Sequence, residues 1–303
     1  MKKVIAFDIG GTKTLGAIVT ESGEILERIR VATNPQFGPK NIIGSLFRII
    51  RKFQEQGYQI DAIGIGAAGR ININTGVVFY ASDNIPNWTN QEIKKLVEQE
   101  FKIKTYVDND CNVAGLGEEW LGAARNSKSY VSLSLGTGVG AAVKVNGKLL
   151  HGEHWSGAEL GHMTIHPGGR ECNCGLFGCL EQYCSGPSLV KTYNEMALEP
   201  ISTGYEFFDL LNKNNECSRI VIEEFVRNLT YASVSLFNIY DPDLLIIGGG
   251  LIDTREYWWN SYIKKINESP LNELFELKVV PAELGSDAAL YGAAYLALTE
   301  LKK

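Results

Sequence analysis

Two glycine-rich turns, each joining a pair of apolar segments, most limit what this chain can fold into. The first lies within residues 4–20, around Gly10 and Gly11, and the second lies within residues 129–145, around Gly136. Short glycine turns between apolar runs are typical of β-hairpins. The sequence therefore predicts a β-hairpin at the start of each half of the chain.

After each hairpin, helical and strand patterns alternate. The clearest helical patterns cover residues 41–56 in the first half and residues 217–240 in the second. Such alternation predicts an α/β protein with two similar lobes and a cleft between them. We expect a small N-terminal lobe at residues 1–112 and a larger C-terminal lobe at residues 113–286. We expect the final helix, about residues 287–303, to pack back on the first lobe.

The composition narrows the class of protein. The chain has 303 residues, of which 45% are hydrophobic and 21% are charged, as in soluble globular proteins. A net charge of -6 disfavours a nucleic-acid surface, although backbone N–H groups and Mg²⁺ still permit a phosphorylated ligand. Lys2 and Lys3 precede too few apolar residues for a signal peptide, and no apolar run approaches the ~18 residues of a membrane span. We therefore expect a cytoplasmic protein that does not contact a membrane.

Three cysteines and two histidines lie close together in the second half. Thiolate and imidazole groups on a tight loop are the ligands of a tetrahedral Zn²⁺ site, and four protein ligands leave no open position, so the zinc would be structural. The alternative is three unligated thiols. Glu159 and Glu181 lie at the two ends of this segment and suggest a pocket for a hydroxyl-rich ligand. The candidate ligands are Cys172, Cys174 and Cys179 with either His162 or His166.

Three glycine segments could bind phosphate or nucleotide. Paired glycines let backbone amides approach a polyphosphate, and Asp8 at the end of the first strand could hold hydrated Mg²⁺. Taken alone, each segment could equally be a plain turn. The three together favour a nucleotide site. The segments contain Asp8, Gly10, Gly11, Thr12 and Lys13; Gly136, Thr137 and Gly138; and Gly248, Gly249 and Gly250.

The run Asp108-Asn109-Asp110 lies where a predicted strand ends and a predicted helix begins. A carboxylate at such a position could accept a proton from a substrate hydroxyl. Asn and Asp are also favoured N-cap residues, so capping is the alternative. One residue of the run could cap the helix while another does chemistry.

Together, and in this order, these motifs resemble the ROK family of repressors, open reading frames and kinases. The resemblance extends from Asp8 to the final helix. Its most specific part is Glu159-Leu-Gly-His162, followed by the three cysteines and Glu181. The resemblance implies an actin-like ATPase (ribonuclease H-like) fold and an ATP-dependent sugar kinase with Mg²⁺ and structural Zn²⁺.

The resemblance also implies roles for individual residues. Asp110 would be the catalytic base, and the glycine segments would bind ATP. His162 would be the fourth zinc ligand while its other ring nitrogen faces the sugar. Sugar hydroxyl contacts would come from Asn84, Asn109, Asp110, Glu159, His162 and Glu181.

Two departures from the family pattern leave the sugar open. Residues 66–72 stand where many members carry Pro-Gly and an acidic residue, and Asp108 stands where many carry Glu. Glucose is the first expectation. N-acetylmannosamine is the next, and other N-acetylhexosamines, fructose or a β-glucoside are further alternatives. We expect transfer to the 6-hydroxyl group, and a homodimer, as is common for kinases of this type.

Three other functions have discriminating features. A repressor of the same family would carry a helix-turn-helix ahead of the sugar domain, and a hairpin beginning at Asp8 leaves no room for one. A zinc hydrolase would need an open coordination position. A sugar sensor without catalysis would not need both Asp8 and Asp110. These features favour the kinase.

Overall fold

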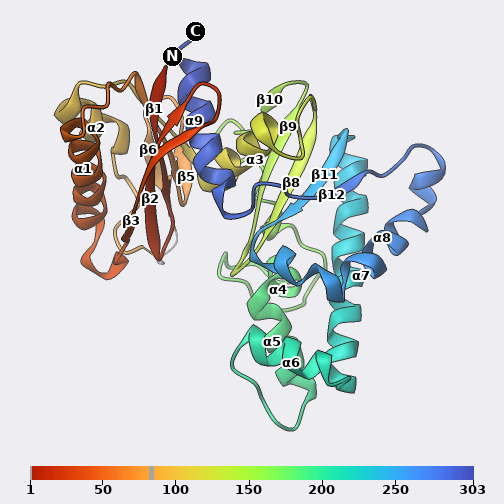
Figure 1. Cartoon of the computed structure of the whole chain (residues 1–303). Coiled ribbons are helices and arrows are strands. Elements are labelled where there is room, and N and C mark those ends of the chain that lie inside the picture. Colours follow the sequence, from red (N-terminus) through yellow and green to blue (C-terminus); the bar gives the residue numbers. More distant parts are fainter. Residues whose placement is uncertain (1, 82–84) are drawn as a thin grey trace. The chain divides into compact units, whose positions relative to one another are not determined.

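The structure is a computed structural model that describes residues 2–81 and 85–303 (Figure 1). The chain divides into two compact units. The expected boundary at residue 112 falls inside helix α3 (Asp110–Leu121), which packs against α9 (Ala288–Glu300) in the first unit. The first unit comprises Met1–Asn126, Leu149–Gly157 and Glu283–Lys303, and the second comprises Ser127–Lys148 and Ala158–Ala282.

The first unit is built on a five-stranded sheet with the order β3-β2-β1-β4-β7. The first three strands form an antiparallel meander, and β4 and β7 continue parallel to β1. The predicted hairpin at the N-terminus is confirmed. The strands are β1 (Lys3–Ile9), β2 (Lys13–Thr20), β3 (Ile25–Ala32), β4 (Ala62–Ala67) and β7 (Thr105–Asn109).

Alternation along β1 gives this sheet two different faces. Phe7 and its odd-numbered neighbours face a core made with α1 (Pro39–Glu55) and α2 (Ile93–Phe101). Val4 and Ala6 face the opposite side, against the Ala-rich helix α9. Side chains of a strand alternate between faces, so Asp8 points to the side of α9 and α3. Figure 1 shows α1 and α9 on opposite sides of the sheet.

Glycines allow α3 and α9 to pack very closely. A β-carbon at Gly292 of α9 would lie 1.5 Å from the carbonyl oxygen of Val113, and one at Gly117 of α3 would lie 2.1 Å from that of Ala288. Gly64 of β4 likewise leaves no room for a side chain beneath Ala293. These contacts hold both helices on the face of the sheet to which Asp8 points.

The second unit repeats the topology of the first. Its five-stranded sheet has the order β10-β9-β8-β11-β12, again with an antiparallel hairpin followed by parallel strands. The second predicted hairpin is therefore also confirmed. The strands are β8 (Tyr130–Leu135), β9 (Val139–Val145), β10 (Lys148–Leu149), β11 (Leu244–Gly248) and β12 (Val279–Pro281).

Helix α7 (Glu216–Tyr240) is the centre of the helical part of this unit. It packs against four shorter helices, and its inner face is apolar, with Phe225 beside Trp258 at 5.4 Å between ring centroids. Its buried Ser233 hydroxyl lies 2.6 Å from the Tyr262 hydroxyl, which satisfies both groups. The shorter helices are α4 (Glu181–Cys184), α5 (Gly186–Met196), α6 (Gly204–Asn212) and α8 (Trp259–Asn267).

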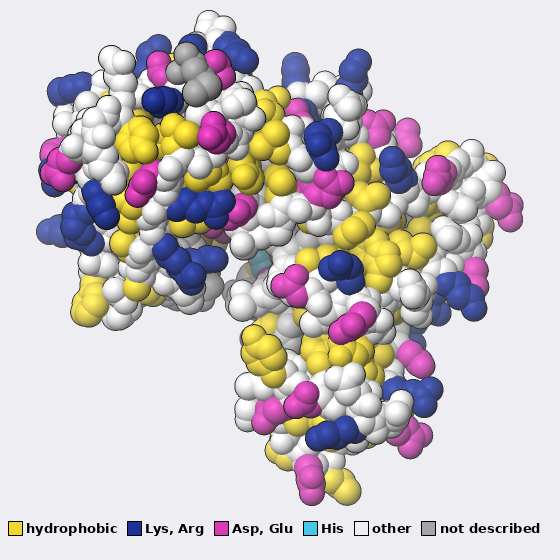
Figure 2. All heavy atoms as spheres, in the orientation of Figure 1, with side chains coloured by type: hydrophobic (Ala, Val, Ile, Leu, Met, Phe, Trp, Pro, Cys, Tyr) yellow, Lys and Arg dark blue, Asp and Glu magenta, His cyan; other side chains and the backbone are white. Residues whose placement is uncertain are grey.

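Some elements were not predicted from the sequence. The small hairpin of β5 (Arg70–Asn72) and β6 (Val77–Tyr80) follows β4, and short 3-10 helices precede and follow several longer elements. Within the described part of the chain, no helix is long and apolar enough to span a membrane. On the face seen in Figure 2, Lys and Arg side chains are interspersed with Asp and Glu, so no basic patch gathers there.

Candidate active site and metal cluster

Asp8 is the last residue but one of β1, and only the buried Ile9 separates it from the first glycine turn. The turn is closed by the Gly10 N–H, which donates to the Lys13 carbonyl at 3.0 Å, and by the Thr33 hydroxyl, which donates to the Gly10 carbonyl at 2.7 Å. Gly11 is exposed, and a β-carbon there would meet no other atom. Burial raises the pKa of Asp8, and the charge of Lys13 partly opposes the rise. The turn is thus an open, hydrogen-bonded loop next to a carboxylate.

Gly66 makes room for Asp110. In the sheet, Gly66 of β4 lies between Asp8 of β1 and Asp108 of β7. A β-carbon at Gly66 would lie 2.5 Å from Val113 and 3.7 Å from the Asp110 Cα. The first turn of α3 therefore settles on the sheet over this glycine, and this brings Asp110 near Asp8.

The local environment makes Asp110 an unusually basic carboxylate. Burial raises its pKa to about 6, and the charge of Asp8 adds to the rise, although the Cys111 N–H lowers it in part. One oxygen, Oδ1, accepts from the Cys111 N–H and from Asn109 Nδ2, both at 2.9 Å. Such a carboxylate is ionised at neutral pH yet accepts a proton more readily than an ordinary aspartate.

Asn109 caps α3, as one reading of the sequence expected. Its side-chain oxygen accepts from the N–H groups of Cys111 and Asn112, and its amide nitrogen donates to the Gly69 carbonyl at 2.9 Å. One residue of the run therefore caps the helix, and the next residue carries the carboxylate that could accept a proton. The two alternatives for this motif are compatible.

The first residue of the run, Asp108, pairs with a histidine that no sequence motif pointed to. His151 Nε2 lies 2.8 Å from Asp108 Oδ2, and the two side chains are 18% and 3% exposed. Burial lowers the pKa of His151, but the hydrogen bond and charge of Asp108 outweigh this, and the net pKa is raised. The two residues are 43 positions apart, so no local pattern indicated the pair.

In the second unit, the two other glycine segments lie side by side. The β-carbon position of Gly136 is 4.0 Å from the Gly250 backbone nitrogen, and Gly249 has a positive φ of 81° against the end of β8. The Gly136 N–H donates to the Gly138 carbonyl at 2.9 Å, which closes the β8–β9 turn. Gly138 also leaves space for Glu181, whose Oε2 accepts from the Val139 N–H at 3.0 Å.

The cysteine-rich loop brings four potential metal ligands together. The ligand atoms of His162, Cys172, Cys174 and Cys179 all lie within 4.8 Å of one another. The Cys174 and Cys179 sulfurs are 3.6 Å apart, and the Cys172 sulfur is 3.5 Å from His162 Nδ1. Two thiolates on one tetrahedral Zn²⁺ are about 3.8 Å apart, so the donor set and its spacing fit that ion.

The alternative histidine is engaged elsewhere. His166 Nε2 lies 2.9 Å from Asn228 Oδ1, and the ring packs on Tyr183 at 4.4 Å between centroids. His162 is held beside the cysteines because Gly161 packs tightly on β9, where a β-carbon would lie 1.9 Å from the Val139 carbonyl oxygen. Any larger residue at position 161 would collide with β9, which explains why a glycine precedes His162. Glu159, just before this turn, is exposed.

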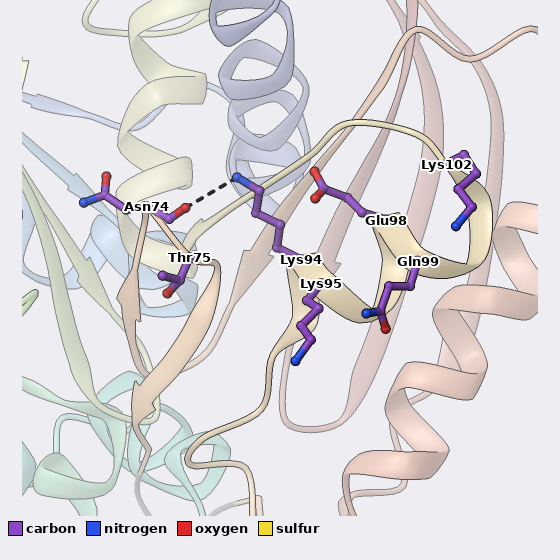
Figure 3. Close-up of a pocket in the computed structure, with 7 residues that line it drawn as sticks. All are labelled: Asn74, Thr75, Lys94, Lys95, Glu98, Gln99 and Lys102. Atoms are coloured by element: carbon purple, nitrogen blue, oxygen red, sulfur yellow. Dashed lines mark hydrogen bonds between the residues drawn. The ribbon is translucent and has the colours of Figure 1, made fainter.

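The predicted site residues thus gather in two groups, one in each unit. The first contains Asp8, the glycine turn, Asn109 and Asp110, and the second contains the other glycine segments, Glu159, Glu181 and the metal cluster. Asn84, a predicted sugar contact, lies outside the described residues. Figure 3 shows an open pocket of about 340 Å³ elsewhere in the first unit, along α2, and none of the described site residues lines it.

The lysines of this pocket are largely engaged. Lys94 Nζ lies 3.5 Å from the Asn74 carbonyl oxygen (Figure 3). Lys95 pairs with Glu92 at 2.7 Å. Glu98 accepts from the Thr105 N–H and brings negative charge to the same pocket. We therefore assign this pocket no part in the candidate site.

Comparison with known proteins identifies the class. The model of the ROK family matches residues 4–300. The chain is 31% identical to a glucokinase from Halalkalibacterium halodurans, over 96% of this chain and 94% of that protein. The ROK hexokinase from Thermus thermophilus superposes with a TM-score of 0.89 at 30% identity, covering 99% of both chains. A ROK family glucokinase from Streptomyces griseus, solved with glucose and AMPPNP, superposes with a TM-score of 0.78 at 30% identity, covering 98% of this chain and 99% of that one.

The predicted actin-like ATPase fold is confirmed by these structures and by the repeated sheet topology. The chain belongs to the ROK family.

Proposed function

We propose that this chain is an ATP-dependent sugar kinase that transfers the γ-phosphoryl group of ATP to the 6-hydroxyl group of a hexose, with glucose as the first-choice substrate. The observation that carries the proposal is the carboxylate of Asp110, desolvated beside Asp8 at the start of α3, in a chain of the ROK family. The likeness to a glucokinase solved with glucose and an ATP analogue supports both substrates.

In this mechanism Asp110 is the general base. Its carboxylate accepts the proton of the sugar hydroxyl as that oxygen attacks the γ-phosphorus, and ADP leaves with the electrons of the broken P–O bond. A pKa of about 6 suits the task, because the group is mostly ionised at neutral pH. Asn109 holds Oδ1 of Asp110 by a hydrogen bond, which leaves the other oxygen for the substrate. Phosphoryl transfer depends mainly on positioning and charge stabilisation.

ATP would be held by the backbone of the glycine segments. The first segment comprises residues 8–13, and the paired segments of the second unit contain Gly136, Thr137 and Gly138 and Gly248, Gly249 and Gly250. Asp8 would hold Mg²⁺, which supplies charge neutralisation on the phosphates when bound. Burial raises the pKa of Asp8, and a bound cation would stabilise its ionised form.

The sugar would be bound by polar side chains. Glu159, His162 and Glu181 would join Asn84, Asn109 and Asp110 in contacting its hydroxyl groups. Zn²⁺ on His162 and the three cysteines would brace the loop that carries these residues, as a structural ion. ATP and reduced thiols both fit a cytoplasmic protein. We also propose a homodimer, which light scattering on the purified protein would test.

A coupled assay of ADP release over a panel of hexoses and amino sugars tests the proposal. We expect turnover on glucose that Asp110→Asn abolishes. The proposed substrate would be revised, but the kinase reaction retained, if turnover occurred in place of glucose on N-acetylmannosamine, another N-acetylhexosamine, fructose or a β-glucoside. Binding of sugar without ADP release from any of them would favour a non-catalytic sensor and overturn the kinase.

A further inference from the structure

The segment Leu149–Gly157 belongs to the first unit, although its first residue ends β10, a strand of the second unit's sheet. Among the residues that the structure describes, its side-chain contacts there include those of His151 and Ser156. His151 Nε2 lies 2.8 Å from Asp108 Oδ2, and Arg70 Nη1 lies 3.3 Å from the Ser156 hydroxyl. The Gly157 N–H donates to the His151 carbonyl at 2.8 Å and closes the segment into a loop. The loop is thus fixed at both ends.

Asp108 connects this loop to the start of α3. Its Oδ1 accepts from the Asn109 N–H at 2.7 Å and from the buried Asn112 Nδ2 at 2.9 Å, while its Oδ2 faces His151. Three donors from three directions orient the carboxylate. Without His151, one buried carboxylate oxygen would lose its partner, and an unpaired buried charge is strongly unfavourable. Asp108 would then move toward solvent or turn.

A movement of Asp108 would reach Asp110 through Asn109. The Asn109 N–H donates to Asp108 Oδ1, and its side-chain oxygen accepts from the Cys111 N–H and so caps α3. Its Nδ2 donates to the Gly69 carbonyl and to Asp110 Oδ1. Each of these bonds fixes the backbone between β7 and α3. The orientation of the Asp110 carboxylate therefore depends on Asp108.

We infer that His151 is a positioning residue for phosphoryl transfer, which acts through Asp108 to hold Asn109 and Asp110 in place. The inference rests on the proposed function. His151 does not exchange a proton with the substrate in this role. It provides a partly buried hydrogen-bond donor to Asp108 Oδ2.

The test compares three single variants in the ADP-release assay. A displacement of a catalytic group by about 1 Å costs ~10²-fold in rate, so His151→Ala should lower kcat about 10- to 100-fold. The KM for ATP should stay within about threefold, because the glycine segments are untouched. His151→Gln places an amide donor near the position of Nε2 and should keep kcat within about threefold. The control is His154→Ala, a histidine of the same loop that is exposed, and it should be unchanged.

A double variant separates positioning from general destabilisation. If His151 acts through Asp108, then His151→Ala combined with Asp108→Asn should be no slower than Asp108→Asn alone. Added imidazole should also restore part of the kcat of His151→Ala. Losses that multiply in the double variant, or a His151→Gln protein as slow as His151→Ala, would overturn the inference.

The remaining outcomes are also decisive. A folded His151→Ala protein with a kcat within twofold of that of the unmodified chain would contradict the role inferred for His151. It would not contradict the proposed kinase function. An unmodified chain with no turnover on any sugar would remove the proposed function and this inference with it. If His151→Ala does not fold, the kcat of His151→Gln is compared with that of Asp108→Asn. The inference expects the first to stay within about threefold of the unmodified chain and the second to be slower.

Discussion

Asp110 lies over Gly66, with its Cα 3.7 Å from the position that a β-carbon of Gly66 would occupy. The same β-carbon would lie 2.5 Å from the Val113 side chain, so the absence of a side chain at Gly66 lets the start of α3 rest on the sheet between the strands that carry Asp8 and Asp108. Burial, together with the nearby charge of Asp8, raises the pKa of Asp110. A backbone feature of one strand thus sets the chemistry of a residue on another element.

The first prediction concerns the pH dependence of catalysis. A general base must be ionised, and the pKa of Asp110 is about 6. We expect kcat/KM for the sugar to be constant near neutral pH and to fall about tenfold for each pH unit below about 6, since this ratio reports the free enzyme. Initial rates between pH 4.5 and 8, with a check that the protein stays folded, measure it. A flat profile down to pH 4.5 would contradict the assignment of Asp110 as base.

The second prediction concerns stability. The pKa of Asp110 is higher in the folded protein than its usual 3.8, so its ionised form destabilises the fold. This destabilisation is complete above about pH 6 and disappears as the pH falls toward 3.8. Asp110→Asn keeps an oxygen acceptor without the charge and should raise the unfolding free energy at pH 7.5 by about 1 to 3 kcal/mol.

Urea unfolding of both proteins at two pH values measures this effect. The gain from Asp110→Asn should shrink at pH 4.5, where the native aspartate is largely protonated. The control is Asp209→Asn, the same change at an exposed position of α6. It should change the unfolding free energy by less than about 0.5 kcal/mol. A loss of stability in Asp110→Asn at pH 7.5 would show that burial does not control this carboxylate.

Much of the fold could be predicted because its signals are local. The apolar strands and the glycine turns between them lie within short stretches of sequence, and the predicted hairpins at Gly10 and Gly136 are both present. The helix at residues 217–240 has a clear apolar face and was placed within one residue of its N-terminus. Local periodicity and turn chemistry carry this information.

The rest depends on contacts between distant residues. His151 and Asp108 are 43 positions apart, and nothing next to either residue marks the other. The fit of Gly292 against Val113 is equally invisible locally, because a glycine inside a helix normally signals only lower propensity. The cysteine cluster was accessible because its cysteines lie within one short loop, although the choice of His162 over His166 needed family resemblance.

The third prediction tests the metal cluster. Cys174→Ser removes one of four ligands and should reduce zinc in the purified protein from about one ion per chain to a small fraction. Because a bound ion at a hundred times its Kd stabilises a fold by about 2.7 kcal/mol, we expect a loss of at least that size in zinc-containing buffer. The sugar KM should rise, because the loop that carries His162 loses its brace.

Elemental analysis, thermal unfolding and initial rates measure these three effects. The matched control is Cys217→Ser at the start of α7, a cysteine outside the cluster, which should keep its zinc and its KM. Full zinc content in Cys174→Ser would contradict the four-ligand assignment. Lost zinc with an unchanged KM would leave the metal site in place and remove its link to sugar binding.

The last prediction compares two glycines that both lie inside helices. A β-carbon at Gly292 of α9 would be 1.5 Å from the Val113 carbonyl oxygen, whereas one at Gly44 of α1 would meet only the flexible end of Arg48, at 3.6 Å. Alanine has the higher helix propensity at both positions. Gly44→Ala should therefore raise the unfolding free energy by about 0.5 to 1 kcal/mol. Gly292→Ala should lower it by more than about 3 kcal/mol, because α3 and α9 must separate.

Since α3 begins at Asp110, the separation should also lower kcat in any Gly292→Ala protein that folds, while Gly44→Ala keeps the kcat of the unmodified chain. Chemical unfolding and the ADP-release assay on the same preparations provide both readings. Equal unfolding free energies of the two variants would contradict the importance of the close contact between α3 and α9.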